Sequence, residues 1–315
     1  MIRGVGVKAP FKSGFVAIIG RPNAGKSTFV NRVVGQKISI VTSHPQTTRN
    51  RIQGIVNRPG AQVALIDTPG LHRADSELGR HMAREVEAAL DSVDAVALML
   101  DATEEIGPGA RQALERAAAL KSARIILLNK IDRVAKPTLL PKIDECSRAG
   151  EFAEIVPISA LSGKGIEEAI AAIIAHLPEG PPLFPEDQVT DQPERFLASE
   201  FVREKAMTVT REEVPHAIAV RVESFEEGEK LIRIQANIEV EREGQKGILI
   251  GKGGQTLKRI GTEARKELES VLGIKIFLEL RVGVVRRWRD DHARVRRLDW
   301  RNQLEAIADQ QADEE

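Results

Sequence analysis

Short apolar segments alternate with amphipathic segments through the first half of the chain. Helical patterns such as residues 111–121, where apolar side chains recur every three or four positions, separate the apolar runs. The apolar runs are short enough for strands buried on both faces, and they lie at residues 15–20, 62–67, 95–101, 124–130 and 154–159. This alternation predicts βαβ units and therefore an α/β domain with a mostly parallel, doubly wound sheet.

The pattern changes near residue 178. Residues 179–194 combine several prolines with acidic side chains and show no periodicity, which predicts a linker. Apolar periodicity then returns in a different order, with helices predicted at residues 195–207 and 255–272 and strands at 216–225, 231–241 and 275–285. We therefore expect a first domain at 1–178, an α+β second domain at 195–290, and a tail at 291–315 that is basic and then acidic.

The composition is that of a globular protein, and its charge is unevenly distributed. Of the 315 residues, 42% are hydrophobic and 29% are charged, and 46 basic side chains balance 46 acidic ones. Residues 242–301, however, hold 16 basic and 8 acidic side chains, which is a local net charge of +8. The second half of the chain could therefore contact a polyanion such as a nucleic acid.

Several classes of protein are excluded by the same composition. No apolar run approaches the ~20 residues of a membrane-spanning helix, and the basic start of the chain lacks the apolar core of a secretory signal. We therefore expect the protein in the cytoplasm, and nothing in the sequence requires more than a monomer. The single cysteine, Cys146, excludes an internal disulfide and a thiolate-rich metal site, so we expect a helix-packed thiol.

A glycine-rich sequence follows the first apolar run and precedes a helical pattern. Residues 20–27 match the phosphate-loop pattern, in which glycines let backbone N–H groups turn inward around a phosphate. Lys26 would bridge the β- and γ-phosphates, and the Ser27 hydroxyl would hold Mg²⁺. The residues expected to contact the nucleotide here are Gly20, Arg21, Pro22, Asn23, Ala24, Gly25, Lys26, Ser27 and Thr28.

Further motifs follow predicted strands and complete a nucleotide site. In the sequence Asp67-Thr68-Pro69-Gly70, the Asp67 carboxylate could hold Mg²⁺ through water, and the Gly70 N–H could reach the γ-phosphate. In Asn129-Lys130-Ile131-Asp132, the final carboxylate could accept hydrogen bonds from guanine N1–H and N2–H₂, a donor pair that adenine lacks. The backbone N–H groups of Ser159 and Ala160 could meet guanine O6. Because parallel strands end at one edge of a sheet, these motifs together predict GTP as the ligand.

Two threonines lie between the phosphate loop and the first of these motifs. Thr47 or Thr48 could supply a second hydroxyl to Mg²⁺ while the γ-phosphate is present, which is how switch loops become ordered. Leu71 follows Gly70 at the position where Ras-like enzymes carry a glutamine that orients the attacking water. Hydrolysis should therefore be slow unless a monovalent cation, a backbone group or a partner assists it.

Two GxxG sequences lie in the second domain, and their surroundings distinguish them. The pair at Gly244 and Gly247 has no special context, whereas Gly251-Lys252-Gly253-Gly254 separates an apolar GILI from the helix predicted at 255–272. A glycine loop between two helices lets a nucleic-acid backbone approach closely, and lysine there meets phosphate. The expected RNA-binding residues are Lys246, Gly251, Lys252, Gly253, Gly254, Lys258 and Arg259, with Arg265 and Lys266 extending the basic rim.

Aromatic residues add little to this interface. With nine Phe, two Trp and no Tyr, a platform of stacking aromatics is not expected. Trp288 and Trp300 lie in the basic tail, which could form a helix that binds RNA or could simply dock through its tryptophans.

Together these motifs resemble the Era family of bacterial GTPases (Era/TrmE-type), a Ras-like GTPase domain fused to a type II KH domain. The resemblance extends from Gly14 to Trp288. It rests on GRPNAGKS, QTTR, DTPGLH, NKID and ISA before the linker, and on SEFVREKAMTVTREEVPHA and GILIGKGGQTLKRIGTEARKELE after it. Arg281 stands where the family often has an aromatic residue, and the tail after Trp288 is longer and more basic than the family leads us to expect.

The resemblance implies a GTP-switched protein that binds 16S ribosomal RNA near its 3′ end during small ribosomal subunit assembly. Its cofactors would be GTP or GDP with Mg²⁺, and its site of action the cytoplasm, with peripheral association at the inner membrane. The resemblance selects Thr48 as the metal-binding switch threonine, so that Lys26, Thr48 and Gly70 form the catalytic set. Asn23 corresponds to a phosphate-loop asparagine that related families link to potassium-assisted hydrolysis.

Two other hypotheses are compatible with parts of the sequence. One is a constitutive RNA-binding scaffold with a structural nucleotide domain, against which the complete set of Lys26, Ser27, Asp67 and Asp132 argues. The other is a related GTPase such as the double GTPase Der, against which the single phosphate loop and the KH pattern argue.

Overall fold

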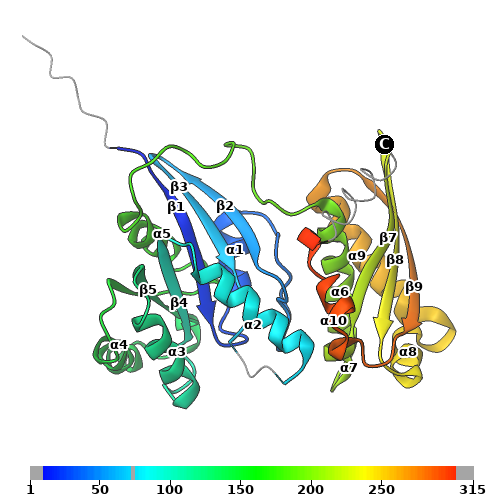
Figure 1. Ribbon diagram of the computed structural model, residues 1–315, viewed down its shortest axis with the longest axis horizontal. Coiled ribbons are helices and arrows are strands. Elements are labelled where there is room, and N and C mark those ends of the chain that lie inside the picture. The colour runs from blue at the N-terminus through cyan, green and yellow to red at the C-terminus, as the bar shows by residue number, and fades with distance from the viewer. Residues whose placement is uncertain (1–9, 72–74, 303–315) are drawn as a thin grey trace, which may run out of the picture. The chain divides into compact units, whose positions relative to one another are not determined.

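The computed structural model describes residues 10–71 and 75–302, and these residues form two compact units (Figure 1). The first unit comprises residues 10–35, 53–67 and 88–191. The second comprises residues 36–52, 68–87 and 192–302. The sequence analysis assigned residues 36–52 and 68–87 to the first domain, whereas the structure groups both segments with the second unit.

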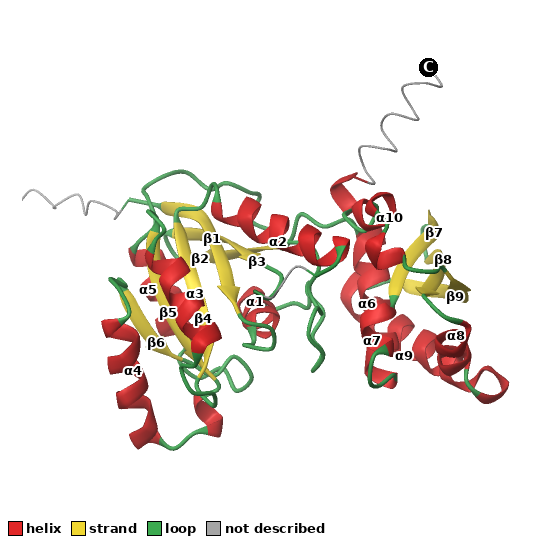
Figure 2. Cartoon of the chain, turned by 60° about the horizontal axis from the view of Figure 1, so that its bottom comes forward, coloured by secondary structure: helices red, strands yellow, loops and turns green. Residues whose placement is uncertain are grey.

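The first unit is built on a six-stranded sheet in the order β2-β3-β1-β4-β5-β6 (Figure 2). Its strands are β1 (Lys12–Gly20), β2 (Ile52–Arg58), β3 (Ala61–Asp67), β4 (Ala95–Asp101), β5 (Ala123–Asn129) and β6 (Glu154–Pro157). β1 pairs in parallel with β3 and β4, β4 pairs in parallel with β5, and β5 with β6. The mostly parallel sheet predicted from the apolar runs is therefore confirmed.

Strand β2 is the part of this sheet that the sequence did not predict. Only Pro59 and Gly60 separate it from its neighbour β3, and so short a connection permits only an antiparallel pair. β2 is also the edge strand, and its sequence IQGIVNR mixes polar residues among the apolar ones. On its outer side β2 meets only the short segment at Val189 and Thr190, so it lacks the continuous apolar run of the central strands.

The order of the strands also fixes where the helices lie. The chain passes from β1 through α1 (Lys26–Val34) to β2 and β3 on one side, and it then returns across the sheet to β4. Because crossovers between parallel strands are right-handed, this reversal places α1 on one face and α3 (Pro108–Ala118) and α4 (Leu139–Arg148) on the other. The reversal leaves a crevice at the C-terminal ends of the strands, where α/β sheets bind ligands.

The remaining helices of this half of the chain are α2 (Glu77–Leu90), which passes from the second unit into the first, and α5 (Ile166–Ala175). Cys146 in α4 is buried, and burial raises the pKa of its thiol to about 11. Thiols react as thiolates, so this cysteine is an inert packed thiol, as the sequence predicted.

Residues 178–191 belong to the first unit and are held along it by hydrogen bonds. The Ser13 N–H donates to the Pro178 carbonyl oxygen (3.2 Å), and the Gln62 Oε1 accepts from the N–H groups of Leu183 (2.6 Å) and Phe184 (2.9 Å). Phe184 also meets Phe15 edge to face, with ring centroids 6.0 Å apart. Most of the residues predicted to form a linker are therefore held against the first unit by these contacts.

The second unit contains a three-stranded sheet in the order β7-β8-β9. β7 (Ala219–Glu227) runs antiparallel to β8 (Leu231–Val240), which runs parallel to β9 (Lys275–Val284). The helices are α6 (Glu194–Val209), α7 (Val214–Ala217), α8 (Glu243–Ile250), α9 (Gln255–Leu272) and α10 (His292–Arg296). The α+β second domain and its order of elements are as predicted.

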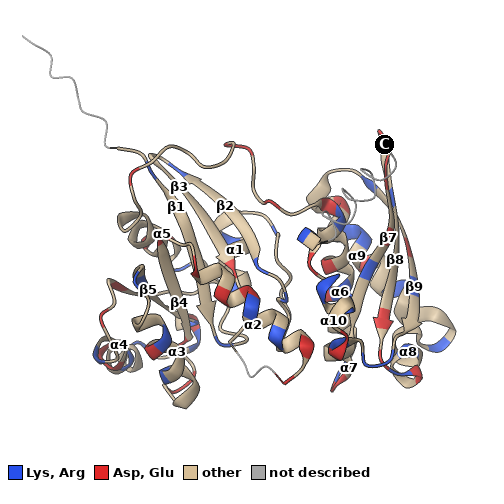
Figure 3. Cartoon of the chain, viewed as in Figure 1, with Lys and Arg blue, Asp and Glu red and all other residues tan. Residues whose placement is uncertain are grey.

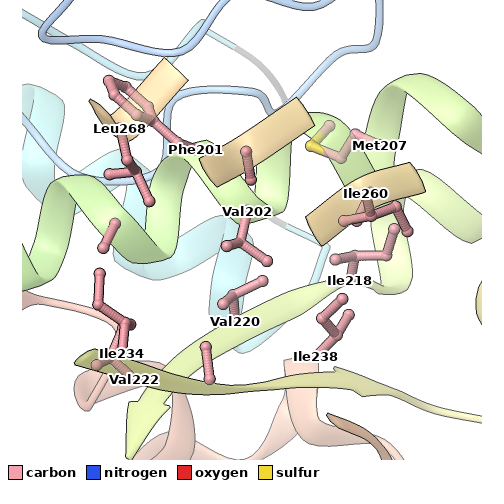
Figure 4. Packing of buried hydrophobic residues seen from close by; sticks show 14 of the residues in the cluster. Phe201, Val202, Met207, Ile218, Val220, Val222, Ile234, Ile238, Ile260 and Leu268 are labelled. Carbon is pink, nitrogen blue, oxygen red and sulfur yellow. The ribbon is translucent and has the colours of Figure 1, made fainter. Parts of the chain in front are cut away.

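Two long helices cover one face of this small sheet (Figure 4). α6 contributes Phe201 and Met207, and the sheet contributes residues such as Ile234 and Ile238. Along α9, Ile260, Ala264 and Leu268 are fully buried because they recur on one face at helical spacing. The second unit thus has its own core, which holds α9 and the loop before it in a fixed place. Within the described part of the chain, no helix is both long enough and apolar enough to span a bilayer.

Candidate nucleotide and RNA sites

The phosphate loop connects β1 to α1 as the sequence predicted. Gly20 (φ +154°) ends the strand, where an added Cβ would lie 2.4 Å from the Met99 carbonyl oxygen. At Gly25 (φ +102°), an added Cβ would lie 2.2 Å from the Asn129 Nδ2. Gly20 is therefore required by its close approach to the Met99 backbone and Gly25 by its close approach to the Asn129 side chain. Gly25 is also the N-cap of α1, and a helix N-terminus binds anions through its free N–H groups.

Lys26 is buried at the start of α1. Its ammonium donates to the carbonyl oxygens of Gly20 (3.1 Å) and Arg21 (3.1 Å). Burial lowers the pKa of Lys26 to about 8, and the nearby Asp67 opposes this shift. The side chain is thus mostly charged at neutral pH and lies inside the loop that would wrap a phosphate.

The two residues predicted to hold the metal ion lie together. The Ser27 hydroxyl donates to the Asp67 Oδ2 at 2.7 Å, and the Asp67 side chain is fully buried at the end of β3. A hydroxyl and a carboxylate are hard oxygen donors, which Mg²⁺ prefers, and Mg²⁺ commonly binds through only one or two protein oxygens plus phosphates and water. This donor set fits the ion that the sequence analysis assigned.

Asn129 connects the phosphate loop to the loop after β6. Its side-chain amide donates to the Ala24 carbonyl oxygen (2.7 Å), while its Oδ1 accepts from the Ala160 N–H (2.9 Å). The Ser159 N–H donates to the Lys164 carbonyl oxygen (2.8 Å). Both N–H groups that the sequence analysis offered to guanine O6 donate to groups of the protein in this structure, and their contact with the base stays a prediction.

The rest of the base motif is placed for recognition. Lys130 adopts a left-handed backbone conformation (φ +67°), and its ammonium pairs with the Asp101 carboxylate at 2.5 Å. Asp132 is exposed, and among the described residues its carboxylate makes no ion pair or side-chain hydrogen bond. A carboxylate in this state can accept two hydrogen bonds from a guanine edge. The sequence did not reveal Asp101 as the residue that holds Lys130.

Thr48 and Gly70, which the sequence analysis assigned to the nucleotide site, belong to the second unit. The segment 36–52, which we call the switch segment, contains no helix or strand before β2 begins, yet Thr48 is only 6% exposed. Lys37 pairs with Glu204 of α6 at 2.6 Å and with Glu267 of α9 at 2.5 Å. The switch segment is therefore held by the helices of the KH core.

The two GxxG sequences have different structures. Gly244 and Gly247 lie within α8, whereas Gly251, Gly253 and Gly254 all have positive φ (71°, 59° and 78°) in the loop between α8 and α9. An added Cβ at Gly251 would lie 2.2 Å from the Thr256 Oγ1, so the start of this loop tolerates no side chain. The prediction that only the second pair forms a loop is confirmed.

Figure 3 colours the Lys and Arg positions of the chain blue. The basic side chains around this loop differ in whether an acidic side chain pairs with them. Arg259 pairs with Glu263 at 2.7 Å and Arg265 with Glu269 at 3.4 Å. No ion pair to an acidic side chain in the described chain holds the others, which are Lys246, Lys252, Lys258 and Lys266. The charges without an acidic partner are available to phosphate, so they contribute most to an electrostatic interface.

A groove runs beside the glycine loop. Leu257 and Gly261 of α9 line it on one side and Leu278 and Leu280 of β9 on the other, with basic side chains at its rim. An apolar floor with a charged rim suits a single-stranded nucleic acid, whose bases stack while its backbone stays at the edge. Sequence reasoning missed this groove, although a glycine in the middle of a long basic helix was a signal for it.

The two tryptophans of the tail, Trp288 and Trp300, are buried in the protein. Trp288 is 1% exposed and its indole N–H donates to the Ala217 carbonyl oxygen (2.8 Å). Trp300 is 8% exposed, and the Arg301 guanidinium lies 4.5 Å from its ring centroid. Of the two alternatives for the tail, docking by its tryptophans is therefore the one observed, while residues 303–315, with their acidic end, lie outside the described residues.

These sites define a P-loop GTPase that carries a KH domain. A family model described as a 50S ribosome-binding GTPase matches residues 15–130, and a KH-domain model matches residues 213–289. The chain belongs to the Era family of GTPases, because it is 44% identical to two crystallised Era proteins and covers 98% of each.

The two Era structures were determined with ligands. One is a complex with MgGDPNP and nucleotides 1506–1542 of 16S ribosomal RNA, and it aligns over 91% of this chain with a TM-score of 0.88. The other is a single-residue variant of Era from Aquifex aeolicus bound to GDP·AlF4⁻, which also aligns over 91% of this chain, with a TM-score of 0.87. The fold class and the family expected from the sequence are therefore confirmed.

Proposed function

We propose that the protein is a slowly hydrolysing GTP switch that binds 16S ribosomal RNA near its 3′ end through its KH domain and acts in small ribosomal subunit assembly. One observation carries the proposal: a complete phosphate-loop site and a glycine loop beside a basic-rimmed groove occur in the same chain. The relationship to Era, crystallised with a GTP analogue and a 16S RNA fragment, supports the choice of both ligands.

Residues of the nucleotide site have separable roles in this proposal. Lys26 contacts the β- and γ-phosphates, and Asp132 selects guanine. Ser27 would hold Mg²⁺ directly and Asp67 would hold it through water, and their hydrogen bond at 2.7 Å shows that the two side chains lie together. When bound, Mg²⁺ neutralises charge on the phosphate oxygens. Thr48 and Gly70 engage only when a γ-phosphate is present, so they distinguish GTP from GDP.

Hydrolysis is slow in this proposal because no glutamine follows Gly70. Leu71 cannot orient water by hydrogen bonding, so the rate depends on how the remaining groups position the phosphates. Asn23 has a left-handed backbone (φ +61°) in the phosphate loop, where its side-chain oxygen could assist a K⁺ ion. Comparing hydrolysis in K⁺ and Na⁺ tests this role: Asn23→Ala should lose any K⁺ stimulation, and stimulation that persists would exclude it.

The KH domain binds RNA by two kinds of contact. Gly251, Gly253 and Gly254 allow the RNA backbone to approach, and Lys252 with Lys246, Lys258 and Arg259 meets its phosphates. The bases then enter the groove between α9 and β9. Because phosphate contacts carry no sequence information, selectivity for one RNA must come from this groove.

Two variants of the full chain separate the two activities. Lys26→Ala should abolish nucleotide binding, since it removes the only buried cation of the phosphate loop among the described residues. The double variant Lys252→Asp with Gly253→Asp should weaken RNA binding while GTP hydrolysis persists. Retained GTP affinity in the first variant would exclude the phosphate-loop assignment, and retained RNA affinity in the second would move the RNA site elsewhere.

The setting in the cell is a further part of the proposal. We place the protein in the cytoplasm, with the small ribosomal subunit as its partner and with peripheral contact at the inner membrane. The relationship to Era supports this setting. Fractionation of cells tests this setting. The protein should sediment with small-subunit particles in a salt-sensitive manner. If the membrane fraction does not contain the protein, the proposed membrane contact is excluded.

A further inference from the structure

The segment that follows β9 packs into the second unit as an additional layer. It contains a 3₁₀ turn (Trp288–Asp290) and α10, and Trp288 is its deepest side chain. The Trp288 ring packs with Leu78 and Met82 of α2 and with Val295 of α10. The C-terminal segment, by which we mean residues 285–301, therefore contacts the chain that follows the Asp67-Thr68-Pro69-Gly70 motif.

The same tryptophan contacts the switch segment through Arg49. The Arg49 guanidinium lies 5.3 Å from the Trp288 ring centroid, within the distance of a cation–π contact, and its Nη1 donates to the Ile218 carbonyl oxygen (2.7 Å). Arg49 is only 3% exposed. It is thus a buried charge whose position is set by an aromatic ring and one carbonyl group.

This buried guanidinium is incompletely satisfied. Its Nε and Nη2 have no hydrogen-bond partner among the described residues. Burial, and then the positive charge of Arg203, lowers the pKa of Arg49 well below its ordinary value. Buried charges normally have both a carboxylate and a full set of hydrogen bonds, so Arg49 is weakly held where it lies.

The next residue of the switch segment, Asn50, also contacts the C-terminal segment, and it contacts α2 as well. The Asn50 side-chain amide donates to the Leu298 carbonyl oxygen of the C-terminal segment (2.9 Å). Its Oδ1 lies 2.8 Å from the Nε2 of His81 in α2. Arg49 and Asn50 therefore join the switch segment, the C-terminal segment and α2 at one place.

Thr48 directly precedes Arg49, and this proximity has a mechanical consequence. Consecutive Cα atoms are about 3.8 Å apart across a trans peptide, so a displacement of Thr48 either turns the backbone at Arg49 or moves Arg49 itself. We therefore expect a nucleotide that draws Thr48 to a new place to change the environment of Trp288 through Arg49. We propose that Trp288 is a positioning residue for the nucleotide switch: through Arg49 it sets the place of Thr48 and couples the C-terminal segment to the bound nucleotide. This inference rests on the proposed function, which makes Thr48 the switch threonine.

The low content of fluorescent side chains allows the environment of Trp288 to be measured by tryptophan fluorescence. The chain has two Trp and no Tyr, and both tryptophans lie in the C-terminal segment. In a full-length Trp300→Phe variant, emission therefore reports on Trp288 alone. We expect its emission to differ between saturating GDP and a saturating non-hydrolysable GTP analogue, both with Mg²⁺. Occupancy is measured on the same samples with labelled nucleotide.

Each outcome of this experiment decides between explanations. Thr48→Ala in the same background should retain GDP binding and lose the difference between the two spectra. Identical spectra at full occupancy, or a difference that survives Thr48→Ala, would overturn the inference while leaving GTP binding in place. A failure to bind either nucleotide would instead overturn the proposed function.

A second variant tests the role of Arg49 without relying on fluorescence. Arg49→Met keeps an unbranched apolar stem and removes the buried charge. We expect the ratio of GTP-analogue affinity to GDP affinity to change by about fivefold or more, the lower range of measured allosteric couplings. The matched control is Arg281→Met, which removes an exposed arginine paired with Glu279 on β9. A purely structural role would lower thermal stability but leave this ratio unchanged, and an unchanged ratio would overturn the inference.

Discussion

The groove beside the glycine loop predicts the effect of one substitution, Gly261→Leu. Gly261 lies in the middle of α9 and lines the groove. An added Cβ would lie 3.4 Å from the Leu280 Cδ1 and 3.8 Å from its Cγ, which is ordinary van der Waals contact. A leucine at this position also stabilises a helix by about 1 kcal/mol relative to glycine. The variant should therefore fold, with a side chain filling part of the groove.

The expected loss of RNA affinity follows from what the side chain displaces. Packing one base against the leucines of the groove would bury on the order of 50–100 Å² of apolar surface, which at about 20–33 cal/mol per Å² contributes about 1–3 kcal/mol. Because about 1.4 kcal/mol corresponds to a tenfold change in affinity, excluding one base should weaken RNA binding by roughly 5- to 150-fold. GTP hydrolysis in the absence of RNA should be unchanged, since Gly261 lies in the KH core.

A titration of labelled 16S 3′-end RNA at fixed salt measures this loss. The matched control is Gly244→Leu, another helical glycine, around which no atom lies within 4 Å of an added Cβ. It lies at the end of α8 remote from the glycine loop and should bind RNA normally. Unchanged RNA affinity in a folded Gly261→Leu variant would refute the assignment of the groove as the base-binding site.

Three further predictions concern the nucleotide site. Because burial holds the pKa of Lys26 at about 8 and phosphate requires its charged form, GDP affinity should decline as pH rises through 8, and a flat profile from about pH 7 to 9 would contradict this. Asp132→Asn should shift selectivity from guanine toward xanthine nucleotides, measured by competition, and unchanged selectivity would exclude the base contact. Gly25→Ala should weaken GDP binding roughly tenfold or more by displacing the Asn129 amide from the phosphate loop. Gly35→Ala, at a positive φ with open space around it, should not weaken GDP binding, and equal losses in the two variants would show that backbone strain is the cause.

Much of the nucleotide site could be predicted from the sequence because its chemistry is local. The phosphate loop requires glycine where the backbone must approach another group, and the structure gives Gly20 and Gly25 that role. Ser27 and Asp67 could be proposed to hold Mg²⁺ from their places at a helix start and a strand end, and the structure brings the two side chains together. Motifs of this kind depend on a few adjacent residues, so a single sequence reveals them.

Other features depend on contacts between residues far apart in the chain. The Asn129 side chain joins the phosphate loop to the loop after β6, a contact between residues far apart in the chain that no local motif reveals. Strand β2 lacked a continuous apolar run because it lies at the sheet edge. The sequence left open whether the tryptophans of the tail bind RNA or pack against the protein, because burial of a single side chain cannot be read from its neighbours in the chain. The structure shows that Trp288 is buried.

The central claim is that nucleotide state controls RNA binding, and one measurement tests it most directly. Labelled RNA from the 16S 3′ end and a scrambled control are titrated with the full-length protein, in the GTP-analogue and GDP states, at one salt concentration. The switch predicts tighter binding of the 16S sequence with the GTP analogue, and no such gain for the scrambled RNA. Equal affinities for the 16S RNA in both states would contradict the switch and favour a constitutive RNA-binding scaffold.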